Sequence, residues 1–373
     1  MNPMEDALYV EKRLINKAKL NKSPINGSIE LLPLCNMNCD MCYVRLSKKE
    51  MDQKGKMRTA KEWLEVAKEM QKAGTLFLLL TGGEPFLYPE FKEVYLGLKD
   101  LGFVLTINTN GTLIDEDMAQ FLGKHRPRRV NITLYGADER AYTELCHYPG
   151  GFEKTMNAIK LLRKYNVDVK VASSLTKANA PDMDRIIALQ DKLNVPVRVD
   201  TYMMPATRER DKPYQYQSRC DPITAAQIRF RMLKTEMGEE NYKEYICLKH
   251  EQIENFEPEE EPRKVTCMAG NCSFTINWQG EMRPCVILSQ PSISVFEEGF
   301  DKAWKQIVDE LDKIRLNIKC SQCHLRPLCQ TCSACALLEA GSYDAIPQYM
   351  CDYAEESYRI LEEEYKRLKE EKD

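Results

Sequence analysis

This sequence lacks the long apolar runs that mark membrane and secreted proteins. No stretch reaches the roughly 18 to 20 apolar residues that a spanning helix needs, so we expect no membrane partner. The first residues carry acidic side chains where a signal peptide carries basic ones, and no apolar core follows them. We therefore expect a cytoplasmic protein.

The sequence also has no large excess of either positive or negative charge. The 53 Lys and Arg residues nearly balance the 57 Asp and Glu residues, which leaves a net charge of −4. Proteins that wrap nucleic acid present an excess of basic residues, so we expect no nucleic-acid partner. We find neither an internal repeat nor a low-complexity tract. The composition indicates an ordinary globular protein of about two domains.

Cysteine is the residue whose distribution stands out. The chain has 15 cysteines among 373 residues, well below the density of a small disulfide-stapled protein. In a reducing cytoplasm, clustered cysteines bind metals more often than they pair. Three of them fall between residues 35 and 42, and nine fall between residues 267 and 351. We predict two chemical centres on two structural units.

The cysteine-poor stretch alternates apolar strands with amphipathic helices. Strands are predicted from an apolar run at 29–34 and from 76–80, 103–108, 130–134, 167–173 and 195–201. Helices are predicted at 59–71, 90–101, 115–123, 152–165 and 181–193. This alternation is typical of repeated βαβ units with a parallel sheet. It fits an open doubly wound sheet as well as part of a (β/α) barrel.

Polar residues and glycines follow these strands, at the sheet edge where ligand sites collect. At the end of the sixth strand, Arg198, Asp200 and Tyr202 are candidates for facing a substrate, and a core or salt-bridge role fits them equally well. We take Asp200 and Tyr202 as the catalytic candidates.

Cys35, Cys39 and Cys42 form a C-x3-C-x2-C run that is followed by Tyr43. Thiolates ligate zinc and iron–sulfur clusters, and this spacing lets three sulfurs converge from one loop. A closed structural site needs four ligands, whereas three cysteines on a cubane cluster leave one iron open for a small molecule. A structural zinc completed from elsewhere in the chain is the alternative interpretation.

This run resembles the signature of the radical S-adenosylmethionine superfamily, and the resemblance extends from about residue 29 to residue 202. It implies a partial (β/α)6 barrel and a [4Fe–4S] cluster on Cys35, Cys39 and Cys42. In that family the open iron chelates the methionine moiety of S-adenosylmethionine. Reduction, by a protein such as flavodoxin or ferredoxin, then yields a 5′-deoxyadenosyl radical that abstracts hydrogen from the substrate.

Later residues are similar to further features of that family. Gly82, Gly83 and Glu84 match its GGE motif, which contacts the methionine amino group. The resemblance also implies that Tyr43 lies near the adenine through its backbone. Two residues are candidates for ribose or carboxylate contacts, and each fits equally well as a turn or strand-end residue: Asn110 and Ser173.

The C-terminal cysteines allow two zinc ribbons, but their spacing resembles the SPASM extension of radical enzymes. That resemblance implies two auxiliary [4Fe–4S] clusters, one on Cys267, Cys272, Cys285 and Cys332, and one on Cys320, Cys323, Cys329 and Cys351. Cys329 and Cys332 are separated by two residues where the family has three, so Cys335 stays an alternative to Cys332. If Cys272 is not a ligand, the first auxiliary cluster has an open iron. The remaining cysteines read as ordinary thiols: Cys146, Cys220 and Cys247.

These features predict five segments. They are an N-terminal extension (1–28), the partial barrel (29–205), a linker or helical bridge (206–264), a small irregular cysteine-rich SPASM domain (265–352) and a charged C-terminal helix (353–373) that acts as a packing brace. Within the bridge, the polar stretch 206–222 reads as a linker or a substrate-facing loop.

The SPASM resemblance implies a peptide or protein substrate and a maturase that forms a thioether, a carbon–carbon link, an epimer or an oxidised residue. Sulfatase maturases are similar in plan, but they carry an aspartate where this chain has Val286. Only 34 residues precede Cys35, so recognition of a leader peptide would need a separate protein or another surface. Small-molecule or cofactor biosynthesis is a further alternative. The intact cysteine run and the GGE motif argue against a non-catalytic electron-transfer scaffold.

Overall fold

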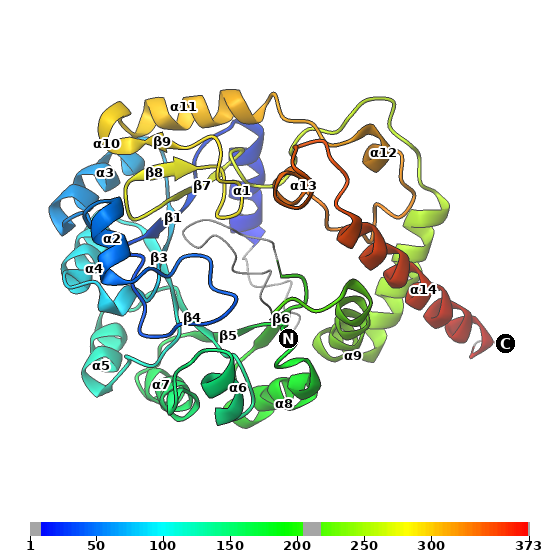
Figure 1. Ribbon diagram of the computed structural model, residues 1–373, viewed down its shortest axis with the longest axis horizontal. Coiled ribbons are helices and arrows are strands. Elements are labelled where there is room, and N and C mark those ends of the chain that lie inside the picture. Colours follow the sequence, from blue (N-terminus) through cyan, green and yellow to red (C-terminus); the bar gives the residue numbers. More distant parts are fainter. Residues whose placement is uncertain (1–8, 204–217, 372–373) are drawn as a thin grey trace.

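We describe the fold from a computed structural model, which describes residues 9–203 and 218–371. Most of the predicted linker or substrate-facing loop, residues 204–217, lies outside the described residues. Six parallel strands, each paired with the next, form the predicted partial barrel (Figure 1). They are β1 (Asn26–Glu30), β2 (Phe77–Thr81), β3 (Val104–Thr109), β4 (Arg129–Thr133), β5 (Val169–Ser174) and β6 (Val197–Asp200).

Helices surround the outer side of these strands (Figure 1). The predicted elements are confirmed within a few residues, except that the first strand begins at Asn26 and ends before the apolar pair Leu31 and Leu32. The helices and short 3-10 turns of this part are α2 (Lys48–Lys54), α3 (Ala60–Lys72), η2 (Pro85–Leu87), α4 (Phe91–Asp100), α5 (Glu116–Lys124), α6 (Glu139–Glu144), α7 (Gly151–Lys164), η3 (Ala180–Asp182) and α8 (Met183–Leu193).

The two faces of the strands differ in polarity, since successive side chains of a strand point to opposite sides. One face is apolar and fully buried in the main core, as Leu80, Ile107 and Ile132 illustrate. The other face lines a cavity with polar side chains, among them Thr81, Asn108 and Thr133. The alternation therefore directs polar chemistry to the barrel interior.

The C-terminal region contributes strands to the same sheet, which the sequence did not predict. β7 (Ser273–Ile276) pairs in parallel with β1, and β8 (Glu281–Arg283) and β9 (Ile293–Ser294) follow in antiparallel order. These strands are too short to carry a clear two-residue period. The predicted irregular cysteine-rich domain is therefore partly regular and continuous with the barrel sheet, which has nine strands within the described residues.

The remaining helices pack at the ends of the sheet and around the cysteine-rich region. The predicted brace is α14 (Gln348–Glu370), which packs along α9 (Pro222–Glu254) through buried residues such as Leu361 and Phe230 (Figure 1). It begins before the predicted residue 353, so Cys351 lies on it. No helix in the described part of the chain is long and apolar enough to span a membrane. The others are α1 (Tyr9–Leu20), α10 (Val295–Glu298), α11 (Phe300–Leu311), α12 (Ile318–Ser321) and α13 (Ser333–Ala340).

Candidate active site

The three cysteines predicted to hold the first cluster lie on one loop after β1, and none of them forms a disulfide. The backbone holds this loop from two sides. The Glu84 amide donates a hydrogen bond to the Leu34 carbonyl at 2.8 Å, and the Asp40 amide donates to the Leu145 carbonyl at 3.0 Å. The positions of the sulfurs are therefore fixed by the backbone of the loop.

Gly82 and Gly83 allow the turn after β2 to approach this loop closely. A Cβ atom on Gly83 would stand 2.1 Å from the Leu34 carbonyl oxygen, and one on Gly82 would stand 2.5 Å from the Leu32 carbonyl oxygen. The φ angle of Gly82, 145°, also disfavours a side chain. Close packing against the cysteine loop therefore explains why both positions are glycine.

Cys35, Cys39 and Cys42 line a cavity of about 420 Å³, here called the cysteine cavity. The Met37 amide donates to Cys35 Sγ at 3.4 Å and the Arg45 amide donates to Cys42 Sγ at 3.3 Å. Such hydrogen bonds stabilise sulfurs that share the charge of an iron–sulfur cluster. Burial raises the pKa of Cys35 to about 12, so a metal must displace its proton.

Three cysteine sulfurs at the wall of one cavity, with amide donors to Cys35 and Cys42, fit a cubane cluster. Among the described residues, no group of three His, Cys, Asp or Glu side chains is placed to hold a single metal ion. Predicted ligand-contact residues also line the cysteine cavity, namely Tyr43, Gly82, Gly83 and Asn110.

Glu84 does not line this cavity, because its carboxylate is buried at the end of β3. It accepts hydrogen bonds from the Thr109 hydroxyl at 2.7 Å, the Asn110 amide at 2.9 Å and the Phe86 amide at 3.2 Å. Complete burial raises the pKa of Glu84 to about 7, although these hydrogen bonds oppose the shift. The Asn110 side chain continues to the cysteine loop, where its Nδ2 lies 3.7 Å from Cys35 Sγ. Glu84 therefore positions Asn110.

Of the two serines at the end of β5, Ser174 lines the cysteine cavity and Ser173 does not. Ser173 shares the face of Val169 and Val171, and its buried hydroxyl has no hydrogen-bond partner among the described residues. The side chain predicted to contact a ligand therefore points away from the cavity. The sequence placed a polar pair at the strand end but did not reveal which member faces inward.

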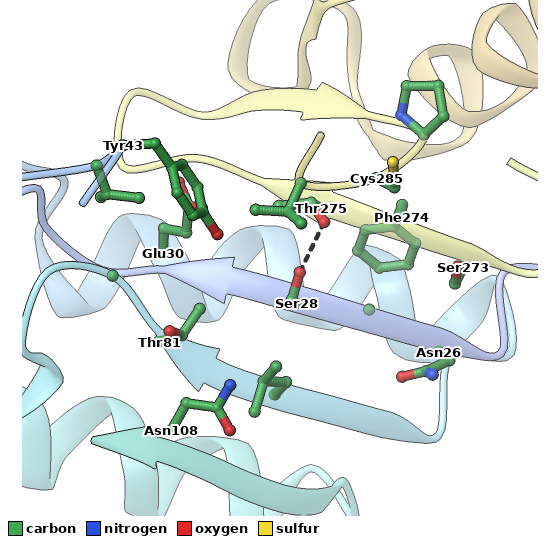
Figure 2. Close-up of a pocket in the computed structure, with 16 residues that line it drawn as sticks. Asn26, Ser28, Glu30, Tyr43, Thr81, Asn108, Ser273, Phe274, Thr275 and Cys285 are labelled. Atoms are coloured by element: carbon green, nitrogen blue, oxygen red, sulfur yellow. Dashed lines mark hydrogen bonds between the residues drawn. The ribbon is translucent and has the colours of Figure 1, made fainter. Parts of the chain in front are cut away.

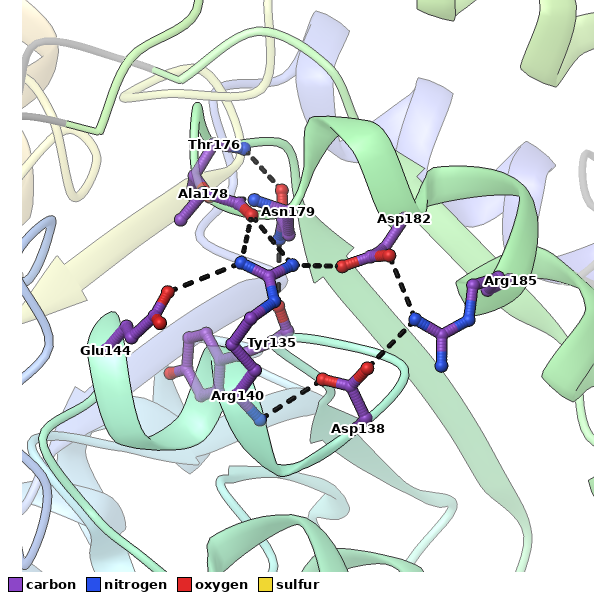
Figure 3. A network of polar contacts seen from close by, with 9 residues as sticks. All are labelled: Tyr135, Asp138, Arg140, Glu144, Thr176, Ala178, Asn179, Asp182 and Arg185. Carbon is purple, nitrogen blue, oxygen red and sulfur yellow. Dashed lines mark hydrogen bonds and ion pairs between the residues drawn. The ribbon is translucent and has the colours of Figure 1, made fainter.

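Tyr135 connects the cysteine cavity to a polar network on the loops after β4 and β5 (Figure 3). Its side chain hydrogen-bonds with Cys39. Asn179 Nδ2 donates to the Tyr135 carbonyl at 2.9 Å and to the Ser174 carbonyl at 3.0 Å. The ends of β4 and β5 are thus tied together at the cavity. Charged side chains bridge the same two loops further out: Asp138, Arg140, Glu144, Asp182 and Arg185 (Figure 3).

Cys146 packs against the cysteine loop, a contact that the sequence did not predict. A hydrogen bond between its thiol and Cys39, together with burial, raises the pKa of Cys39 well above its ordinary value. The Cys146 carbonyl also accepts from the Asn38 amide at 3.0 Å. Because these residues are far apart in the chain, no local spacing could reveal the contact.

A second cavity, of about 470 Å³ and here called the β6 cavity, adjoins the cysteine cavity. The two share Met41, Tyr43, Ser174 and Asp200. Asp200 is half-exposed and pairs with Arg198 at 3.2 Å. Further lining comes from the end of β6, from α9 and from the cysteine-rich region, namely Tyr202, Arg229, Ile287 and Gln330. The cavity therefore lies where the barrel meets the C-terminal region.

A third cavity, of about 310 Å³ and here called the barrel cavity, lies between β1, β2, β3 and β7. Figure 2 shows Tyr43 and Cys285 on the same side of β1, at separate ends of this cavity. The Ser28 hydroxyl donates to the Thr275 hydroxyl at 2.8 Å across the β1–β7 pair. The barrel interior thus connects Cys285, a predicted auxiliary ligand, with Tyr43 of the cysteine cavity.

The structure brings together the four cysteines predicted for one auxiliary cluster. Cys320, Cys323, Cys329 and Cys351 line a single cavity of about 200 Å³. Burial raises the pKa of Cys351 to about 11, and the charges of the other three cysteines contribute to the shift. The Thr331 amide donates to Cys329 Sγ at 3.4 Å. This arrangement suits a closed cluster site.

Of the four cysteines predicted for the other auxiliary cluster, Cys272 lies apart from the rest. Burial raises the pKa of Cys285, and the charges of Cys332 and Cys267 raise it further, so these three sulfurs lie near one another. Cys272 is fully buried in a separate apolar cluster with Ala18. Burial also raises its pKa, and of the described cysteines only Cys267 adds to that shift. Three of the four predicted ligands therefore converge.

Cys332 and Cys335, the two alternatives for one ligand position, face different surroundings. Cys332 immediately precedes α13 and packs in one apolar cluster with Cys285. Cys335 is fully buried in the first turn of α13, within the main core. Their sulfurs are 3.5 Å apart, and the hydrogen bond between them lowers the pKa of Cys332 to about 6. Of the two, Cys332 is thus the cysteine that packs with Cys285.

Residues 29–184 match the Radical SAM superfamily. An AdoMet-dependent heme synthase of Methanosarcina barkeri is 24% identical over 336 residues, which cover 84% of this chain and 92% of that protein. The antilisterial bacteriocin subtilosin biosynthesis protein AlbA of Bacillus subtilis is 21% identical over 343 residues, covering 89% of this chain and 71% of AlbA. The sporulation killing factor maturation protein SkfB of the same organism is 27% identical over 164 residues, or 44% of this chain and 39% of SkfB.

Two solved structures share the fold. Streptococcus suis SuiB bound to its precursor peptide SuiA has a TM-score of 0.68 and 18% identity, and the match covers 94% of this chain and 83% of SuiB. The enzyme anSMEcpe with bound AdoMet has a TM-score of 0.66 and 18% identity, covering 92% of this chain and all of anSMEcpe. These two likenesses show the fold. The Radical SAM match over residues 29–184, together with the cysteine loop, identifies the chain as a radical S-adenosylmethionine enzyme, a class that uses a [4Fe–4S] cluster and S-adenosylmethionine.

Proposed function

We propose that this enzyme modifies a peptide or protein by hydrogen abstraction, and that Cys35, Cys39 and Cys42 hold the reactive cluster. When bound, the cluster and S-adenosylmethionine supply the 5′-deoxyadenosyl radical. The observation that carries the proposal is the continuity of the cysteine cavity with the β6 cavity through shared lining residues. A radical formed in the first cavity would meet a substrate residue held in the second.

The residues around the cysteine cavity suggest distinct roles. Gly82 and Gly83 expose backbone where a cofactor's polar groups would bind. Tyr43 lines the cysteine cavity, the β6 cavity and the barrel cavity. Asn110 faces the cavity beside Cys35 and is held there by Glu84. For the predicted contact at β5, Ser174 is better placed than Ser173.

We infer two auxiliary clusters in the C-terminal region. The set of Cys320, Cys323, Cys329 and Cys351 is supported by the single cavity that all four line. The other set is Cys267, Cys285 and Cys332, with Cys272 as the fourth ligand predicted from the sequence. Electrons would come from flavodoxin or ferredoxin in the cytoplasm.

Two kinds of relative support a peptide substrate. SuiB was solved with a precursor peptide, SkfB is named as the maturation protein of a sporulation killing factor, and AlbA as a biosynthesis protein of the bacteriocin subtilosin. In the β6 cavity, Asp200 and Tyr202 remain the catalytic candidates for proton transfer after hydrogen abstraction. The bond that forms then depends on the peptide.

A carboxylate-bearing small molecule is the second candidate substrate. Arg198 and Arg229 both line the β6 cavity, and guanidinium groups bind carboxylates in a bidentate manner. Heme synthases are among the relatives that match most of the chain. Either substrate class would use the same reactive cavity.

Anaerobic reconstitution with iron and sulfide, followed by dithionite and S-adenosylmethionine, tests the proposal. We expect release of 5′-deoxyadenosine from the wild-type enzyme and from Cys247→Ala, whose cysteine lies outside every predicted set. The Cys39→Ala variant should release none. A fully clustered wild-type sample that forms no 5′-deoxyadenosine would contradict the enzyme function. Stimulation by carboxylated small molecules but by no candidate peptide would favour the second substrate class.

A further inference from the structure

A buried polar chain joins the end of β6 to the cysteine-rich region. The Tyr202 hydroxyl oxygen lies 3.0 Å from Glu339 Oε1 and 3.2 Å from Cys335 Sγ. Arg219 donates to the same Glu339 oxygen at 2.9 Å, and its guanidinium lies 3.4 Å from the centre of the Tyr349 ring. Tyr202, Arg219 and Cys335 are all buried. The position of the Tyr202 hydroxyl is therefore fixed by charged and aromatic neighbours.

Cys335 extends this chain to Cys332, since the two sulfurs are 3.5 Å apart. A cysteine that ligates a metal does so as a thiolate and has no proton to donate. If Cys332 is the ligand, the hydrogen between the two sulfurs must come from the Cys335 thiol. The Tyr202 hydroxyl then donates to the Cys335 sulfur and holds it in position.

Building on the proposed function, we propose that Cys335 is a hydrogen-bond donor to the ligand Cys332, and that Tyr202 holds it in that position. Hydrogen bonds to ligand sulfurs are among the factors that set the reduction potential of an iron–sulfur cluster. A donor stabilises the additional negative charge of the reduced cluster, so this one raises the potential. Tyr202 is a positioning residue here.

The same tyrosine also lines the β6 cavity. A substrate in that cavity would contact a residue that orients the thiol donor of the auxiliary site. Through Tyr202, Cys335 and Cys332, a substrate in the β6 cavity would therefore be linked to the auxiliary site.

Counting bound iron tests whether Cys332 is the cluster ligand and Cys335 only a hydrogen-bond donor. In a Cys35→Ala/Cys39→Ala/Cys42→Ala background only the auxiliary clusters remain, and about 8 Fe per chain are expected from four-iron clusters. Adding Cys335→Ala should leave this count unchanged, whereas adding Cys332→Ala should reduce it to about 4. The opposite pattern, or a background that binds zinc in place of iron, would overturn the proposal.

Redox titration followed by electron paramagnetic resonance tests whether Cys335 raises the reduction potential of the auxiliary cluster. In the same background, Cys335→Ala should lower the potential of one cluster and leave the other unchanged. Cys335→Ser keeps a hydrogen-bond donor and should lower the potential of that cluster by less than Cys335→Ala does. Tyr202→Phe should also lower this potential. Tyr349→Phe is the matched control, because its hydroxyl donates to the Cys220 carbonyl at 3.0 Å and contacts neither sulfur. It should change neither potential.

Unchanged potentials in both Cys335→Ala and Tyr202→Phe would overturn the proposal. Should Cys335→Ala fail to assemble its clusters, Tyr202→Phe decides the result alone. Failure of the proposed function is a separate outcome, since the background cannot cleave S-adenosylmethionine and its potentials remain measurable.

Discussion

The barrel and the C-terminal region hold their cysteines by different means. In the barrel, three cysteines share one loop, and backbone hydrogen bonds fix that loop to the turn after β2 and to residue 145. In the C-terminal region, the cysteines come from separated segments that meet through packing. Cys351 reaches its partners from α14, and Cys285 follows β8. Local backbone geometry thus defines the first site, whereas long-range packing defines the others.

This difference predicts where each region is vulnerable. A change of a single backbone contact should disable the barrel site and leave the C-terminal sites assembled. A change in the buried contacts that hold the C-terminal region should have the reverse effect. Four substitutions test the comparison.

Gly83→Ala should have the largest effect. The alanine Cβ would lie 2.1 Å from the Leu34 carbonyl oxygen. This contact can be relieved only by moving the backbone, because no flexible side chain is involved. We expect 5′-deoxyadenosine formation to fall at least ~1000-fold, equivalent to about 4 kcal/mol, while about 8 Fe stay bound in the C-terminal region. Gly102→Ala is the control for backbone strain away from the cysteine loop, because its Cβ meets no atom within 4 Å but its φ angle is 87°. It should lower stability and leave the activity of the folded chain near wild type. Equal losses in both variants would show that the close contact is not the cause.

Arg219→Met should destabilise the C-terminal region. Arg219 and Glu339 are paired at 2.9 Å with side chains only 7% and 9% exposed. Removing one partner leaves a buried charge without compensation, which costs about 4 kcal/mol. Urea unfolding of the metal-free chain measures this loss, and iron analysis should show fewer auxiliary iron atoms. A wild-type urea midpoint in this variant would mean that the pair does not hold the region together.

The same contrast explains what the sequence could predict. The barrel strands and the cysteine loop are local patterns. All strands but the first could therefore be predicted within a few residues, and the spacing of Cys35, Cys39 and Cys42 was enough to carry the family resemblance. The pairing of β7 with β1 and the contact of Cys146 with Cys39 join residues distant in the chain, and neither leaves a local signal.

The choice between adjacent residues was also beyond the sequence. Strand alternation decides that Ser174 rather than Ser173 faces the cavity, but only once the inner face of the sheet is known. Likewise, the first turn of α13 turns Cys335 into the core and leaves Cys332 beside Cys285.

Glu84→Gln should change the pH dependence of barrel stability. Burial raises the pKa of Glu84 from 4.5 to about 7, so the folded chain holds this proton more tightly than the unfolded chain. The resulting stability is complete below about pH 4.5 and is lost as the pH rises to about 7, by about 3 kcal/mol in total. Urea titrations of the metal-free wild type and variant at several pH values measure the difference. Parallel pH profiles for the two proteins would contradict the shift.

Arg185→Met should have the smallest effect, although Arg185 has two acidic partners. Its guanidinium lies 2.9 Å from Asp138 and 3.0 Å from Asp182, but its side chain is 57% exposed (Figure 3). Water screens such pairs, and ordering long side chains offsets much of the attraction. We expect no resolvable change in the urea midpoint, in contrast to Arg219→Met, which removes the same kind of charge from a buried pair. A loss comparable to that of Arg219→Met would mean that the loops after β4 and β5 depend on side-chain charges, as the C-terminal region does.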